Sequence, residues 1–120
     1  MSASASDCLF CRIVAGEIPA TIVHSDDRTV AFRDINPQAP THVLVVPREH
    51  HPNAAALAAE APELLVEVMR AGAAVAEREG VAASGYRLLF NTGADAGQTV
   101  FHAHLHVIGG ERLGGMAQVG

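Results

Sequence analysis

Three histidines that alternate with apolar residues near the end of the chain limit the folds that it can adopt. Residues 101–108 read Phe-His-Ala-His-Leu-His-Val-Ile. In a β-strand, residues two apart lie on the same face. His102, His104 and His106 then share one face, while the apolar residues between them face the opposite way, toward a covering helix. The alternation therefore predicts a strand over residues 100–108 with one polar face and one apolar face.

The rest of the pattern predicts an α+β domain. Strands are expected from short β-branched runs, and helices from apolar positions at helical spacing. Asp7 and Gly16 would cap a short first helix, and Pro62 and Gly80 would bound a long second helix. Strands joined by tight turns favour an antiparallel sheet. The expected helices are 8–15 and 62–79, the expected strands are 21–24, 29–33, 42–46, 86–90 and 100–108, and 91–99 is expected to be a glycine-rich loop.

Composition excludes several classes of protein. The 120 residues suffice for one domain, expected over 7–120 after a disordered lead-in at 1–6. The formal net charge is −5, and all eight cationic side chains are arginines, so a nucleic-acid partner is not expected. No apolar run approaches the roughly 18 residues of a membrane span, so no membrane partner is expected. The N-terminal residues lack the features of a secretory signal, which predicts a cytoplasmic protein.

The histidine row has three interpretations. Three satisfied imidazoles in an ordinary core are disfavoured, because each needs a polar partner there. A single metal site is also disfavoured, since His102 and His106 would lie about 13 Å apart along a strand, at about 3.3 Å per residue. Nucleophilic catalysis by imidazole remains, and it requires one ring nitrogen held protonated and the other carrying a lone pair. His104 is flanked on both sides and is the best placed of the three for this role.

Cys8 and Cys11 form a Cys-x-x-Cys pair. Because no export signal precedes them, a structural disulfide is disfavoured. A metal pair, a redox pair and two inert thiols all remain open.

The histidine row resembles the signature of the histidine triad family, in which three histidines alternate with apolar residues. The resemblance extends over nearly the whole chain and is strongest to the branch of histidine triad nucleotide-binding proteins, which hydrolyse purine nucleoside phosphoramidates. It implies a five-stranded antiparallel sheet with two helices, joined edge to edge with a second chain as a homodimer. The other matching segments are Gly-Glu-Ile-Pro at 16–19, Asp-Ile-Asn-Pro-Gln-Ala-Pro-Thr-His at 34–42, the run 43–47, Gly-Tyr-Arg at 85–87, Asn91, and Ala-Gly-Gln-Thr-Val-Phe-His at 96–102.

The resemblance also implies the roles of the histidines. His104 attacks the α-phosphorus and forms a covalent nucleotidyl-histidine, which water then hydrolyses to release a nucleoside monophosphate. His42, His102 and His106 complete the catalytic set, with His42 and His106 supporting His104 and the phosphate.

The resemblance further implies a purine nucleotide site. Asp34 would hold the ribose hydroxyls, and the glycine-rich loop would bring backbone N–H groups close to the phosphate, in a chain without lysine. The residues implied at the phosphate are Asn91, Gly97, Gln98 and Thr99, and those implied in the apolar slot for the purine are Leu9, Phe10, Ile13, Ile18, Phe32 and Ile35.

The cysteine pair has a counterpart in some members of the family, where two histidines complete a metal site. Here these would be His50 and His102, with His51 as the adjacent alternative to His50. The resemblance thus implies a structural zinc site of Cys8, Cys11, His50 and His102, with two reduced thiols as the alternative. No cofactor is expected for catalysis.

Two other functions stay open. One is a dinucleoside polyphosphate hydrolase or nucleotidyl transferase of the same family. The other is a nucleotide-binding regulatory module without catalysis, which the intact histidine row disfavours. The segment 109–116 resembles the bacterial form of the C-terminal tail and lacks the tryptophan-containing ending of animal relatives.

Overall fold

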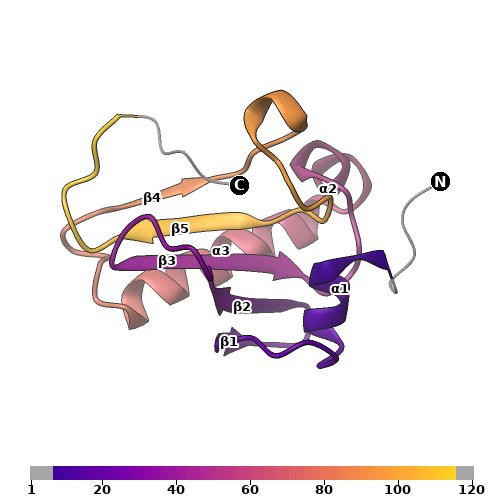
Figure 1. Cartoon of the computed structure of the whole chain (residues 1–120), viewed down its shortest axis with the longest axis horizontal. Helices are drawn as coiled ribbons and strands as arrows, with labels where there is room; N and C mark the ends of the chain where they lie inside the picture. The colour runs from indigo at the N-terminus through magenta and orange to yellow at the C-terminus, as the bar shows by residue number, and fades with distance from the viewer. Residues whose placement is uncertain (1–6, 116–120) are drawn as a thin grey trace.

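The strands form one antiparallel sheet, drawn face-on in Figure 1. The computed structural model describes residues 7–115. Along the sheet the order is β1-β2-β3-β5-β4, so the last strand lies between β3 and β4. The elements in chain order are α1 (Leu9–Val14), β1 (Ile22–Ser25), β2 (Thr29–Arg33), β3 (Thr41–Pro47), α2 (Ala54–Glu60), α3 (Pro62–Arg78), β4 (Tyr86–Leu89), the 3-10 turn η2 (Ala94–Ala96) and β5 (Leu105–Gly109).

The two faces of the sheet are covered by different helices. On one face, the α3 side chains pack against Ala103, Leu105 and Val107. On the opposite face, α1 contributes to a smaller cluster with side chains of β2 and β3 (Figure 1). The apolar residues between the histidines thus belong to the α3 core, as the alternation predicted, and the histidines lie on the α1 side.

The helix α3 (Pro62–Arg78) matches its expected range closely. Proline stands at its first position and Gly80 beyond its end has a φ of 77°, a left-handed conformation that favours glycine. The buried side chains repeat at helical spacing, so one stripe of the helix faces the sheet. They are Leu64, Val68, Ala71, Gly72, Val75 and Ala76.

The last strand differs from its expected range. It was expected over 100–108, but β5 begins at Leu105, paired with Val45 of β3. The residues before Leu105 leave the ladder, and the N–H of Ala103 instead donates to the carbonyl of His51 at 2.7 Å. His102 and His104 are therefore carried by the segment that enters β5, and only His106 lies within the strand.

Two helical features also differ from expectation. Cys8, rather than Asp7, caps α1, because its sulfur accepts the N–H of Cys11 at 3.3 Å. The helix α2 (Ala54–Glu60) was not expected, and Asn53 caps it by accepting the N–H of Ala56 at 2.9 Å. The two expected helices correspond to α1 and α3.

In residues 7–115 no helix has the length and apolar character that crossing a membrane requires. The expected lead-in at 1–6 lies outside the described residues.

Candidate active site and metal centre

A cavity of about 990 Å³ opens on the α1 side of the sheet. The short helix α1 forms one wall, and the end of β2 with the loop that follows it forms another. All six residues expected to form an apolar slot line this cavity: Leu9, Phe10, Ile13, Ile18, Phe32 and Ile35. Ile35 is fully exposed where it stands, so a bound planar ring could cover it.

The polar part of the cavity wall is formed by residues far apart in the sequence. These residues are Asp34, His42, Thr99 and His104. The cavity lining does not include Asn91, Gly97, Gln98, His102 or His106.

The ring of His104 is held in one tautomer. Its Nδ1 lies 2.7 Å from the carbonyl oxygen of His102, and a carbonyl only accepts hydrogen bonds, so Nδ1 carries the proton. The lone pair is therefore on Nε2. Phe10 packs edge-to-face against the ring with centroids 5.0 Å apart, which limits its rotation. A lone pair on a ring of fixed orientation in a cavity wall is what an imidazole nucleophile requires.

A second pair of histidines lies beside His104. The main-chain N–H of Gln38 donates to Nδ1 of His42 at 3.0 Å, which places the His42 proton on Nε2. That Nε2 lies 2.9 Å from Nδ1 of His106, so His106 accepts there and carries its own proton on Nε2. The ring centroids of His104 and His106 are 5.1 Å apart. These hydrogen bonds place the proton of each of the two rings, His42 and His106, on Nε2.

Asp34 approaches this pair. Its Oδ2 lies 3.4 Å from Nε2 of His42. Burial lowers the pKa of His42, and the nearby Asp34 carboxylate opposes that effect. Because burial prevails, His42 is neutral near pH 7, which agrees with the tautomer that its hydrogen bonds require.

The glycine-rich loop takes its shape from its glycines and from Gln98. Gly93 and Gly97 have φ values of 88° and 93°, which other residues rarely adopt. The Gln98 side chain was expected at the phosphate, but it is buried and its amide is bonded to main chain. Its Oε1 accepts the N–H of Gly93, and its Nε2 donates to the carbonyls of Pro52 and Val100. Gln98 thus shapes the loop that presents Thr99 to the cavity.

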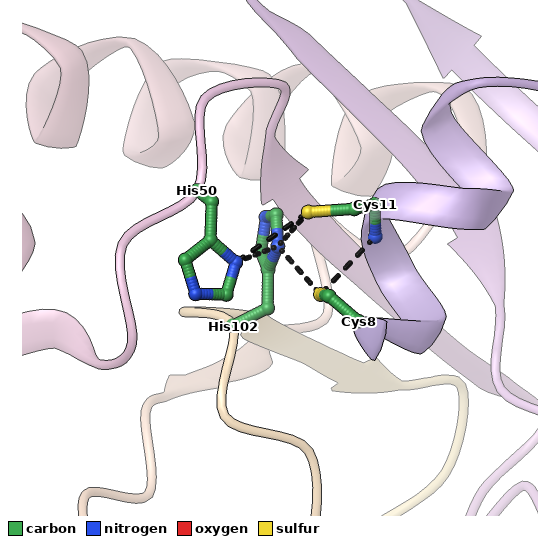
Figure 2. Close-up of side chains that lie close together, drawn as sticks. All are labelled: Cys8, Cys11, His50 and His102. Atoms are coloured by element: carbon green, nitrogen blue, oxygen red, sulfur yellow. Dashed lines mark hydrogen bonds between the residues drawn. The ribbon is translucent and has the colours of Figure 1, made fainter. Parts of the chain in front are cut away.

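Four sulfur and nitrogen ligands meet next to the cavity (Figure 2). The figure shows Cys8 and Cys11 reaching from α1 toward His50 and His102, which come from two other segments. The ligand atoms all lie within 4.8 Å of one another. Cys8 Sγ is 3.3 Å and Cys11 Sγ is 3.4 Å from His102 Nδ1, and the two histidine Nδ1 atoms are 3.2 Å apart.

These four residues fit a tetrahedral zinc ion. Zinc bonds of about 2.0–2.3 Å place neighbouring ligand atoms about 3.3–3.8 Å apart, close to the separations here. The Nε2–H of His102 donates to the carbonyl of Pro47 at 2.8 Å, which leaves the lone pair on Nδ1, toward the cluster. Burial lowers the pKa of His102 to about 4, so this ring is a neutral ligand at pH 7. Without a cation, burial and the adjacent Cys8 raise the pKa of Cys11 to about 12.

The structure separates the two adjacent histidines that sequence left as alternatives. His50 points Nδ1 at the cluster, 3.4 Å from Cys11 Sγ. His51 lies elsewhere, with its two ring nitrogens 2.8 Å from carboxylate oxygens of Glu49 and Glu60. His50 is therefore the residue placed to bind a metal.

Comparison with known proteins gives one consistent family. The family model described as the HIT domain matches residues 15–113. Among curated proteins, the purine nucleoside phosphoramidase of Escherichia coli (strain K12) is 45% identical over 112 residues, covering 93% of this chain and 94% of that protein. A HIT family hydrolase from Legionella pneumophila Philadelphia 1 has a TM-score of 0.86 at 44% identity, covering 90% of this chain and 96% of that one. A histidine triad protein from Clostridium difficile has a TM-score of 0.88 at 37% identity, covering 98% of this chain and 100% of that one.

Proposed function

The chain belongs to the HIT domain family, and from this membership we propose that it hydrolyses the P–N bond of purine nucleoside phosphoramidates and releases a nucleoside monophosphate. The purine nucleoside phosphoramidase of Escherichia coli matches this chain over 94% of its own length. That relative is 45% identical to this chain over 112 residues.

The observation that carries the proposal is the hydrogen bond from His104 Nδ1 to the carbonyl of His102, at 2.7 Å. It holds His104 in the tautomer with a nucleophilic Nε2, in a ring that lines a cavity of about 990 Å³. A cavity with an apolar wall and a carboxylate at its edge suits a purine attached to a ribose. A regulatory module without catalysis has no need of a fixed nucleophile.

The proposed reaction has two displacements at phosphorus. His104 Nε2 attacks the phosphorus, the P–N bond to the leaving amine breaks, and the amine departs with a proton taken from the site or solvent. The new P–N bond joins the nucleotide to His104. Water then attacks the phosphorus, the bond to His104 breaks, and the nucleoside monophosphate leaves. His106 is buried beside His104, with ring centroids 5.1 Å apart, and its role is to support that ring.

The test compares His104→Ala with the matched control His24→Ala. His24 is a histidine of β1 that does not line the cavity and bonds to Asp26. We expect His104→Ala to lower kcat on adenosine phosphoramidate by several orders of magnitude, since positioning alone cannot replace a covalent step. Binding of the nucleoside monophosphate should persist in both variants, because Asp34 and the apolar wall remain.

Rapid acid-free quenching of the wild-type protein should trap nucleotide on His104 through an acid-labile P–N bond. Label on His42 or His106, or a His104→Ala variant active within about tenfold of wild type, would contradict the mechanism. A turnover panel of adenosine and guanosine phosphoramidates and diadenosine polyphosphates separates this activity from dinucleoside polyphosphate hydrolysis. Preference for the polyphosphates would favour the second function.

We also propose that Cys8, Cys11, His50 and His102 bind a structural zinc ion. Four protein ligands leave no open position for a reacting water, so the ion would supply fold stability and not Lewis-acid chemistry. The support is the donor set and its convergence within 4.8 Å.

We propose finally that residues 7–120 form one domain of this family and that two chains associate as a homodimer. β1 and β4 are the two edge strands of the sheet, and all four residues of β4 are partly exposed. Exposed edges favour pairing with another chain. Light scattering should then give twice the 12.5 kDa mass of one chain, and a monomer at micromolar concentration would refute the dimer. The expected cytoplasmic location and the expected absence of nucleic-acid and membrane partners stay predictions.

A further inference from the structure

His51 is buried, yet its ring is bonded to two acidic side chains. Its exposed fraction is 5%. Nδ1 lies 2.8 Å from Oε1 of Glu60, and Nε2 lies 2.8 Å from Oε1 of Glu49. Both distances are within hydrogen-bonding range, so the ring is held at two points, one on each nitrogen. Its two nitrogens thus face carboxylates, away from the cluster of Cys8, Cys11, His50 and His102.

The main-chain carbonyls of His51 and Pro52 accept hydrogen bonds from two segments that border the reaction site. We refer to these two residues as the 51–52 bracket. The carbonyl of His51 accepts the N–H of Ala103 at 2.7 Å. The carbonyl of Pro52 accepts from Nε2 of Gln98 at 2.7 Å. In the chain, Ala103 lies between His102 and His104. Gln98 lies in the glycine-rich loop, directly before Thr99.

The bond to Ala103 matters because the sheet does not hold that residue. β5 pairs with β3 only from Leu105 onward. The N–H of Ala103 lies before this point and takes the carbonyl of His51 in place of a strand partner. The position of the main chain that carries His104 thus depends on the position of the bracket.

The bracket in turn depends on the helix that follows it. Glu60 is the last residue of α2, and Asn53, the cap of α2, comes directly after Pro52. The His51 ring therefore links the bracket to the far end of the same helix. The contact between His51 and Glu60 connects the two ends of this segment, so α2 holds the 51–52 bracket in position.

We propose that His51 is a positioning residue for the nucleophile: held by Glu49 and Glu60, it fixes the 51–52 bracket, whose carbonyls fix Ala103 and Gln98. His51 does not line the cavity, so it acts only through these contacts. The inference rests on the proposed function in one respect, since it takes His104 as the reacting group.

The test removes the two ring nitrogens and keeps a ring. His51→Phe removes both contacts with the carboxylates, and Glu60→Gln changes one of them at a side chain that is 62% exposed. His24→Phe is the matched control, because His24 also bonds to a carboxylate, at 3.0 Å, but on β1. Each protein is prepared with its metal content as purified and checked for an unchanged unfolding midpoint.

Two readouts are measured on each protein. The first is steady-state turnover of adenosine phosphoramidate, where a misplaced nucleophile should lower kcat on the order of 10²-fold in His51→Phe, with KM changed much less. The second is the ¹⁵N NMR signal of the His104 ring, identified by its loss in His104→Asn. Wild type and His24→Phe should show the Nδ1–H tautomer, and His51→Phe should show a mixture of tautomers, because the carbonyl of His102 moves off the ring.

The tautomer readout does not require turnover, so the two hypotheses can fail separately. If wild type does not turn over any phosphoramidate, the proposed function fails, and the NMR comparison still decides the role of His51. If His51→Phe does not fold, Glu60→Gln decides it, with a smaller change of the same sign in both readouts. An unchanged His104 tautomer in the folded variant overturns the proposal, whether or not kcat falls.

Discussion

Acid should destabilise the metal-free protein mainly through His102. This ring is completely buried, with an exposed fraction of 0%. Burial lowers its pKa from the ordinary 6.5 to about 4, and nearby positive charge on other histidines adds to this, while the hydrogen bond to the Pro47 carbonyl opposes it. Protonation in the folded state would put a second proton on Nδ1, which faces Cys8, Cys11 and His50.

The sign and size of the effect follow from these two pKa values. Between pH 6.5 and about pH 4, His102 is protonated in the unfolded chain and neutral in the folded chain. The free energy of unfolding therefore falls as the pH falls. The loss begins near pH 6.5 and is complete near pH 4, where the folded ring also protonates. At about 1.4 kcal/mol for each pKa unit, the full loss is about 3 kcal/mol, a large part of the stability of a small domain.

Urea unfolding followed by circular dichroism, with EDTA present, measures this loss. The free energy of unfolding is compared at about pH 7 and about pH 4 for wild type and His102→Asn, since acid-sensitive groups that do not contact His102 contribute equally to both. Burial also lowers the pKa values of His42 and His50, so this subtraction is needed. Wild type should lose about 3 kcal/mol more than the variant. If wild type and variant lost the same free energy of unfolding, burial would not be holding His102 neutral. Burial would then not be what makes His102 a neutral ligand at pH 7.

Three further predictions concern the metal, the ribose contact and the core. Cys8→Ser should purify without the single zinc ion per chain that elemental analysis is expected to find in wild type, and retention of the ion would show that Cys8 is not a ligand. Asp34→Ala should raise KM more than it lowers kcat, and a deoxyribose substrate should lose less in this variant than in wild type; equal losses would remove Asp34 from the ribose. Leu64→Ala, at a side chain with 1% exposure, should lower the free energy of unfolding by about 2–5 kcal/mol in urea, and a loss well below this would show a loosely packed α3 face.

The sequence predicted well those features that depend on local periodicity. The alternation around the histidines correctly placed Ala103, Leu105 and Val107 in the α3 core. Helical spacing and its end signals predicted α3 (Pro62–Arg78) closely. In both cases the pattern records which face of an element is buried, and burial is what stabilises these elements.

Features that depend on contacts between distant segments were missed. The early start expected for the last strand was wrong because Ala103 donates to His51, about fifty residues earlier, and no local pattern reveals such a partner. The helix α2 was missed because it is rich in alanine and buries only Leu57, so it has no amphipathic stripe. Asn53 before it was the available signal.

The choice between His50 and His51 could not be made from sequence either. Both are neighbours in the chain, and the difference lies in which groups surround each ring after folding. Glu60 bonds to His51 from the end of a helix that the sequence pattern did not reveal. The proposed ligand role of His50 follows only once that carboxylate is in place.

His102 contacts two neighbouring groups, one through its side chain and one through its main chain. Its side chain faces the cysteines, while its main-chain oxygen accepts a hydrogen bond from Nδ1 of His104. A carbonyl is common to all twenty amino acids, so the bond that selects the His104 tautomer does not depend on which side chain residue 102 carries. The proposed metal centre can therefore be lost or gained by substitution in descendants of this chain, or removed by a protein engineer who refills the space, while the contact that orients the His104 ring is inherited unchanged.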